Sequence, residues 1–170
     1  SYAIVPYQGP GETRRRPIYI ECRKDAVILQ PEGIVLREED FEGPNGPGNP
    51  LAAALRAKRE YLLSYGNLDP REAGEPYPLL IVRENGIAAY YLARDAMTSW
   101  GAEFGYELVD ADWKVEFQQP DPQLAALLRQ TIDAARMRQE RLIAAAPRHY
   151  GSQGSQVYYR AAPGGGIVVD

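Results

Sequence analysis

The chain has few side chains that could perform covalent chemistry. Its 170 residues contain one cysteine, Cys22, and one histidine, His149. One residue of each kind cannot supply a Cys/His zinc site, and a thiolate–imidazole pair would need the two to meet across most of the chain. Cys22 shares a face of a predicted strand with Ile18 and Ile20, which is typical of a packed thiol. We therefore predict no catalytic residue, no metal and no cofactor.

Carboxylates are the remaining candidates for acid–base chemistry. They form two clusters, Glu38-Glu39-Asp40 and Asp110/Asp112. Neither has the glycine-punctuated spacing of a calcium loop, and both are typical of solvated turns. The neighbouring loop 41–50, FEGPNGPGNP, lacks the Lys-Ser/Thr of a phosphate-binding loop, and its prolines remove amide donors. A hydrolase or transferase with an acid-lined cleft near loop 41–50 stays open as an alternative function.

A basic cluster raises the question of nucleic acid. Arg14, Arg15 and Arg16 are consecutive and precede a predicted strand. The chain as a whole carries a net charge of −4, so no global field attracts a polyanion. A solvated patch or a contact with an acidic partner is therefore the favoured interpretation of these arginines, and nucleic-acid binding through Arg14–Arg16 is a second alternative function.

The elements that would position these groups follow from periodicity. Alternation at 18–22 and an apolar run at 26–30 predict a hairpin, and IVL at 34–36 a further short strand. Asn49-Pro50 and Asp121-Pro122 are helix-start signals. They predict helices over 50–66 and 121–146. Lys58 lies on the apolar stripe of the first helix and is expected to extend its ammonium group to solvent.

The stretch from Tyr77 to Asp110 reads as strand, turn, helix, turn, strand. PLLIVRE is a continuous apolar run, typical of a strand buried on both faces. Apolar residues from Ala89 to Trp100 recur with helical period, so Asn85-Gly86 is a strand-to-helix turn and not a hairpin turn. A parallel crossover is the simplest connection, with an antiparallel return as the alternative. The residues predicted to stay outside, as a contact surface, are Arg83, Glu84, Tyr90, Arg94 and Asp95.

Together these elements predict an α/β (α+β) fold. It has a single mixed sheet of four to six strands, with WKVEF at 113–117 as another strand, two packed helices and an extra C-terminal helix. Residues 1–146 form one domain. Residues 147–170 form a loosely ordered tail with possible short strands at 156–160 and 167–170.

The order of elements resembles that of the periplasmic domain of the ExbD/TolR biopolymer-transport family. In that family a strand ends in a charged residue and a short turn, followed by a helix with an early aromatic, a glycine and a strand. Arg83 to Gly86, Tyr90 or Tyr91, and Gly101 or Gly105 match this pattern, and the hairpin at 17–36 matches the opening strands. The resemblance covers about residues 17–117. The loops 41–50 and 66–77 are long for the family, and the C-terminal helix and tail lie outside it.

The resemblance implies a small α/β module that dimerises and contacts a cell-envelope protein or glycan. The family's functional aspartate lies in a transmembrane helix that this chain lacks, so no residue here inherits the proton-coupling role. We therefore expect a non-enzymatic, stator-like module. We expect it to be periplasmic and anchored to a membrane through segments outside this chain, although a cytoplasmic location is also compatible with the sequence.

Overall fold

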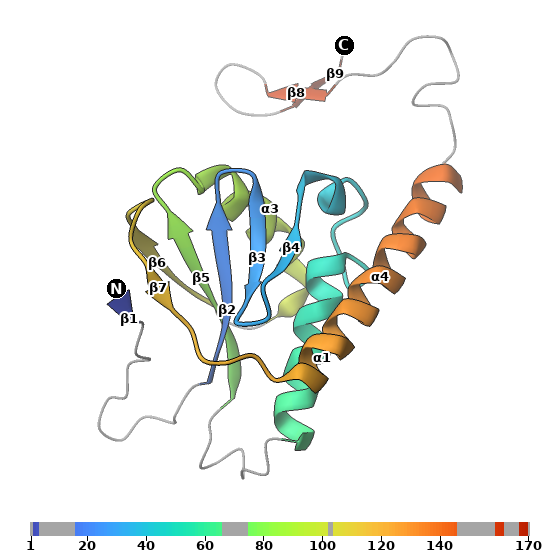
Figure 1. Ribbon diagram of the computed structural model, residues 1–170. Coiled ribbons are helices and arrows are strands. Elements are labelled where there is room, and N and C mark those ends of the chain that lie inside the picture. The colour runs from blue at the N-terminus through green and yellow to red at the C-terminus, as the bar shows by residue number, and fades with distance from the viewer. Residues whose placement is uncertain are drawn as a thin grey trace. The chain divides into compact units, whose positions relative to one another are not determined.

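The computed structural model (Figure 1) describes residues 2–3, 16–65, 75–101, 104–145, 159–161 and 167–169. The chain divides into two compact units, residues 1–140 and 141–170. The division lies inside the last helix, before the boundary expected at residue 146. In the second unit, two short strands, β8 (Tyr159–Ala161) and β9 (Ile167–Val169), form an antiparallel pair.

A five-stranded mixed sheet forms the centre of the first unit, in the order β4-β3-β2-β5-β6. Antiparallel pairs join β2 to β3 and β3 to β4, whereas β5 is parallel to both β2 and β6. The predicted mixed α/β fold is therefore confirmed, as are the hairpin and the parallel crossover. The strands are β2 (Arg16–Arg23), β3 (Ala26–Gln30), β4 (Ile34–Leu36), β5 (Pro76–Arg83) and β6 (Gly105–Val109).

In the described part of the chain, three α-helices accompany the sheet, and the two predicted helix starts are confirmed. The Asn49 side-chain oxygen accepts the amide of Leu51 at 2.8 Å, and that of Asp121 accepts the amide of Gln123 at 2.9 Å. These bonds satisfy amides that have no partner inside the helix. The helices are α1 (Pro50–Tyr65), α3 (Ile87–Ala96) and α4 (Pro122–Ala145), with short 3-10 helices η1 (Glu38–Phe41) and η2 (Thr98–Trp100).

The main core lies between one face of the sheet and helices α1 and α3 (Figure 1). Alternate residues of β2 point to this face because side chains of a strand alternate. Helix α4 lies alongside α1 and completes the core. The fully buried members include Ile18, Ile20 and Cys22 of β2, Leu51 and Leu55 of α1, Ala93 of α3, and Leu128 and Ile132 of α4.

Gly86 makes the turn between β5 and α3 possible. A Cβ atom at this position would lie 2.0 Å from the carbonyl oxygen of Cys22 in β2. The backbone of the turn therefore packs directly on the end of the neighbouring strand, an approach that only glycine permits. Asn85-Gly86 starts a helix, as the helical period after it predicted.

The further strand predicted over residues 113–117, in the segment after β6, is confirmed only in part, and it does not extend the main sheet. Only Val115–Glu116 forms a strand, β7, and it pairs with β1 (Tyr2–Ala3) in a separate two-stranded sheet. Arg83 binds the backbone of this segment, and the ring of Phe117 lies 5.4 Å from that of Tyr19. These contacts hold the segment across the face of the sheet opposite α1 and α3.

Lys58 differs from the expectation that its ammonium group reaches solvent. The residue is 5% exposed, and its Nζ donates to both carboxylate oxygens of Glu32 at 2.5 and 3.0 Å. The β3–β4 turn places Glu32 over α1, where it meets the lysine. A buried carboxylate therefore takes the place of solvent for this side chain.

Candidate functional site

Arg83 is the one residue of the predicted contact surface that the structure places inside the protein. It is 4% exposed, and its Nε donates to Oε2 of Glu21 at 2.9 Å. Its Nη1 donates to the carbonyls of Asp110, at 3.0 Å, and Trp113. The prediction that Arg83 stays on the outside is therefore wrong. A fully buried acid on the neighbouring strand draws the guanidinium inward, and the loop after β6 covers it.

Glu21 is the centre of this buried polar cluster and is 0% exposed. It also accepts hydrogen bonds from Arg23 at 2.8 Å and Gln30 at 3.0 Å. Burial alone would raise the pKa of its carboxyl group, but the bonds from Arg23, Gln30 and Arg83 outweigh burial and hold the pKa below its ordinary value. The donors Arg23, Gln30 and Arg83 stabilise a charged, immobile carboxylate, which is a structural role.

An exposed aromatic cluster lies where α3 meets the edge strand β6. The ring centroids of Tyr90 and Tyr91 are 5.4 Å apart, and those of Tyr90 and Tyr106 are 5.8 Å apart. The Arg94 guanidinium lies 4.7 Å from the centroid of Tyr91, within the range of a cation–π contact. With Leu108, these residues define the α3–β6 surface.

The α3–β6 surface combines apolar area with an open sheet edge. Tyr91 is 49% exposed, Tyr106 59% and Leu108 69%. Among the described residues, β6 pairs only with β5, so its other side presents backbone amides and carbonyls. Glu84 and Asp95 are also exposed. Of the predicted contact residues, Glu84, Arg94 and Asp95 are thus on the surface, and Tyr90 is half-buried beneath the other rings.

Tyr106 and Leu108 were not among the predicted contact residues. The motif YELV places them on one face of a strand, but only the sheet order shows that this strand is an edge. In the sequence, Tyr91 matches the family's early aromatic as well as Tyr90 does, and which of the two rings is exposed depends on where α3 meets β6. The alternation of YELV, combined with a prediction that this strand is the last of the sheet, could have identified the site.

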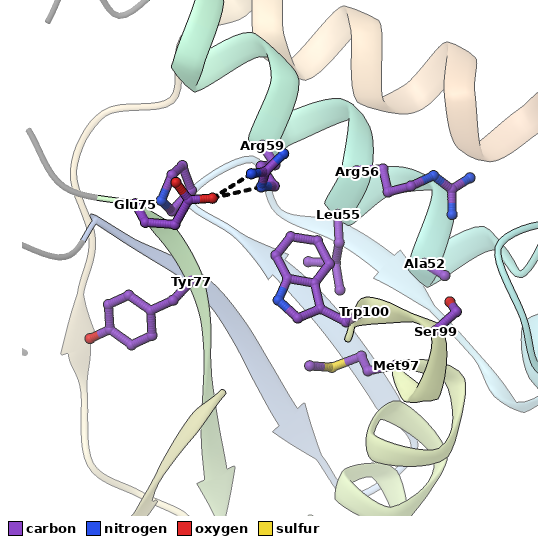
Figure 2. A pocket seen from close by; sticks show the side chains of 10 residues that line it. Ala52, Leu55, Arg56, Arg59, Glu75, Tyr77, Met97, Ser99 and Trp100 are labelled. Carbon is purple, nitrogen blue, oxygen red and sulfur yellow. Dashed lines mark hydrogen bonds and ion pairs between the residues drawn. The ribbon is translucent and has the colours of Figure 1, made fainter. Parts of the chain in front are cut away.

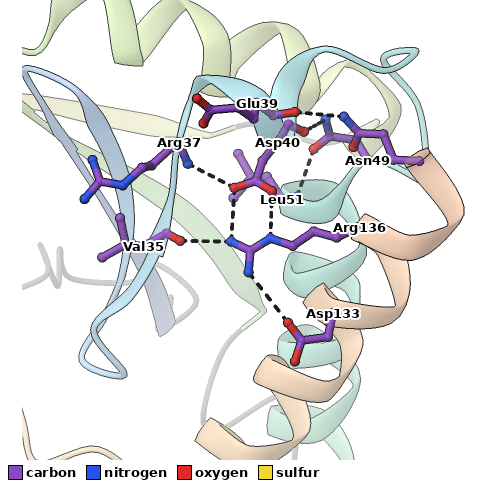
Figure 3. A network of polar contacts seen from close by, with 9 residues as sticks. Val35, Arg37, Glu39, Asp40, Asn49, Leu51, Asp133 and Arg136 are labelled. Carbon is purple, nitrogen blue, oxygen red and sulfur yellow. Dashed lines mark hydrogen bonds and ion pairs between the residues drawn. The ribbon is translucent and has the colours of Figure 1, made fainter. Parts of the chain in front are cut away.

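Asp40, one of the acids next to loop 41–50, makes hydrogen bonds that connect η1 to α4 (Figure 3). Asp40, 8% exposed, accepts hydrogen bonds from Arg136 of α4 at 2.7 and 3.0 Å and from the Arg37 amide at 3.0 Å. The Asn49 side chain donates to the carbonyl of Asp40 at 3.3 Å. These bonds hold the carboxylate of Asp40 in a structural contact between η1 and α4. Across the described ranges, no three His, Cys, Asp or Glu residues are grouped as a metal site would require.

Some of the remaining residues considered as candidate functional residues lie in the described part of the chain, and others lie outside it. Cys22 is 0% exposed, and burial, together with the negative charge of Glu21, raises the pKa of its thiol to about 12. The predicted packed thiol is therefore confirmed. Arg14, Arg15 and His149 lie outside the described residues. Arg16 is half-buried at the start of β2, where its Nη1 donates to the carbonyl of Leu62 in α1 at 3.0 Å.

A separate pocket of about 450 Å³ opens between α1, the start of β5 and η2 (Figure 2). Leu55, Met97 and Trp100 provide apolar walls, and Arg56 and Arg59 contribute guanidinium groups. Arg59 donates to Oε1 of Glu75 from both Nε, at 2.9 Å, and Nη2, at 2.5 Å. No local sequence pattern identifies this pocket, because its lining comes from three segments that are far apart in the chain.

Comparisons of the chain with protein-family models, with curated proteins and with solved structures found no match. Within the described part of the chain, no helix is both long and apolar enough to span a membrane.

Proposed function

We propose that this chain is a non-enzymatic binding module that forms a homodimer through the α3–β6 surface and the adjoining edge of β6. The observation that carries the proposal is the pairing of large exposed side chains, Tyr106 and Leu108, with an unpaired strand edge. Tyrosine and arginine are enriched at protein interfaces, and exposed edge strands are natural sites for pairing with another chain.

A second copy of the chain could pair with the open edge of β6 and cover the exposed apolar side chains of the α3–β6 surface. A two-fold axis beside β6 would pair the two β6 strands antiparallel and close the edge of both sheets. The same axis would bring the two sets of Tyr106 and Leu108 together. Exposed Arg94 and Asp95 supply opposite charges at the rim of such a self-complementary contact.

The cellular setting of the proposal rests on the ExbD/TolR resemblance. The element order supports it: three strands, a helix, a strand, a helix and a strand follow one another in residues 16–109. We place the module on the extracytoplasmic side of a cell envelope, tethered by segments outside this chain and contacting an envelope protein or glycan. An apolar helix carrying one acid, encoded upstream of Ser1, is expected, whereas an initiating methionine directly before Ser1 would contradict the tether.

Sedimentation velocity from about 1 µM to about 1 mM tests the dimer. The chain is expected to shift from monomer to dimer over this range, and Leu108→Lys is expected to keep it monomeric because an ammonium group would be buried at the axis. Met137→Lys on α4, where the methionine is 56% exposed, is the matched control and should dimerise normally. A wild-type chain that stays monomeric throughout, or a Leu108→Lys variant that dimerises like the control, would refute the interface.

A further inference from the structure

The pocket of Figure 2 has the size and walls of a small-molecule site. Its volume of about 450 Å³ falls in the range of roughly 300–1,000 Å³ typical of such sites. Leu55 is 1% and Met97 3% exposed, so the floor consists of fixed core side chains. Trp100 stands over this floor from η2 (Figure 2). A flat or extended apolar group would bury its surface against these three residues.

The charges around the pocket favour an anion. Two guanidinium groups and one carboxylate, that of Glu75, line it, which leaves an excess of one positive charge in a chain of net charge −4. Arg59 is paired with Glu75. Arg56 is exposed and, within the described part of the chain, has neither an acidic partner nor a hydrogen bond.

The two arginines lie at different ends of the pocket. Figure 2 shows Arg59 beside Glu75 and Arg56 at the other end, near Ala52 and Ser99. The Ser99 hydroxyl has no hydrogen-bond partner among the described residues. A free guanidinium and a free hydroxyl therefore flank the same end, where both could donate to one carboxylate.

We propose that this pocket binds a small apolar monocarboxylate, such as a medium-chain or aromatic acid. The carboxylate accepts hydrogen bonds from Arg56 and Ser99, and the apolar body lies along Trp100, Met97 and Leu55. One anionic group is sufficient because Glu75 neutralises Arg59, and a second negative charge would face Glu75. This ligand site is separate from the α3–β6 surface and does not depend on the homodimer.

The fluorescence of Trp100, which lines the pocket, can report ligand binding. The chain has two tryptophans, and Trp113→Phe leaves Trp100 as the only one. Trp113 is 45% exposed, and its contact with Arg83 is through its backbone carbonyl, so this change is expected to preserve the fold. In this background, sodium decanoate is expected to change the Trp100 emission saturably. Decyltrimethylammonium and decanol, which carry the same tail with a positive or no charge, are expected to bind at least about tenfold more weakly.

Variants separate the recognition of the anion from general hydrophobic binding. Arg56→Gln is expected to weaken decanoate binding about tenfold by removing one charge-assisted hydrogen bond. Arg138→Gln, which removes an exposed guanidinium on α4, is the control and should bind like its parent. Ser99→Phe, at an exposed position on the rim, should fill the pocket and abolish binding while the unfolding temperature stays close to that of the parent, and Trp100 remains the only tryptophan.

Three results would contradict the carboxylate site. Absence of a decanoate response, equal binding of decanol, or an Arg56→Gln variant that binds like Arg138→Gln would each overturn the proposal. Sedimentation of the same samples reports the oligomeric state independently. A chain that binds decanoate as a monomer would support this site while refuting the dimer, and the reverse result would refute this site alone.

Discussion

Arg136 and Asp40 are 96 residues apart in the sequence and share two hydrogen bonds, Nε to Oδ1 at 2.7 Å and Nη2 to Oδ2 at 3.0 Å. The fork of the guanidinium matches the two carboxylate oxygens, which is the strongest geometry for such a pair. Nη2 of Arg136 also donates to the carbonyl of Val35 at 3.1 Å. One side chain thus joins α4 to both β4 and η1.

Replacing Arg136 with glutamine is expected to lower the free energy of unfolding by about 1–3 kcal/mol, because Asp40 would remain largely buried with a single amide donor. Urea unfolding followed by circular dichroism measures this change. Asp133→Asn is the control: its carboxylate, 72% exposed, lies 3.6 Å from Arg136, and its loss should cost less than about 1 kcal/mol. Equal effects of the two changes would show that the Asp40 pair does not hold α4.

Replacing Glu21 with glutamine is expected to cost about 3–5 kcal/mol at neutral pH, because Arg83 would remain buried without its anionic partner. The folded protein lowers the pKa of Glu21 below its ordinary value near 4.5. The stability contributed by the ionised carboxylate is therefore complete above about pH 4.5 and is lost as the pH falls through the lower, folded pKa.

The difference in unfolding free energy between wild type and Glu21→Gln should consequently narrow on acidification from about pH 7 to about pH 3. Urea midpoints across this range measure it. Glu84→Gln, at an exposed position one residue after Arg83, should give a curve nearly parallel to that of the wild type. A constant gap for Glu21→Gln would mean that this carboxylate does not contribute to the pH dependence.

Gly86→Ala is expected to destabilise the fold by about 3 kcal/mol or more, since a methyl group 2.0 Å from the Cys22 carbonyl oxygen forces the backbone of β5 or β2 to move. Thermal and urea unfolding measure the loss. Gly48→Ala is the matched control, because the nearest atoms, on the Arg138 side chain, are 3.5 Å away at ordinary contact distance. A mild effect at Gly86, similar to that at Gly48, would contradict the close approach.

Cys22 should resist alkylation in the native state. Its thiol is 0% exposed, and its pKa of about 12 leaves almost no thiolate at neutral pH. Iodoacetamide labelling followed by mass spectrometry is expected to proceed only in urea, where the chain is unfolded. Rapid labelling of the folded protein would show that this end of β2 opens readily.

Much of the architecture could be predicted from local signals. The Asn49 and Asp121 caps, the hairpin of β2 and β3, and the stripe after Gly86 each depend on residues that are close in sequence. Which side chains are buried and which are exposed is predicted less well. Arg83 is predicted to stay outside, yet its buried position depends on Glu21, 62 residues away. Tyr106 and Leu108 were missed because exposure depends on which strand ends the sheet.

The sequence by itself determined which segments become strands and helices and where the helices start, because periodicity, caps and turn glycines act over a few residues. Only the tertiary structure decided which polar groups are buried and which apolar groups are exposed. Glu21, Lys58 and Arg83 are inside because strands and helices far apart in the chain supply their partners, while Leu108 is outside because β6 is an edge. The pocket beside Trp100 likewise exists only where α1, β5 and η2 meet.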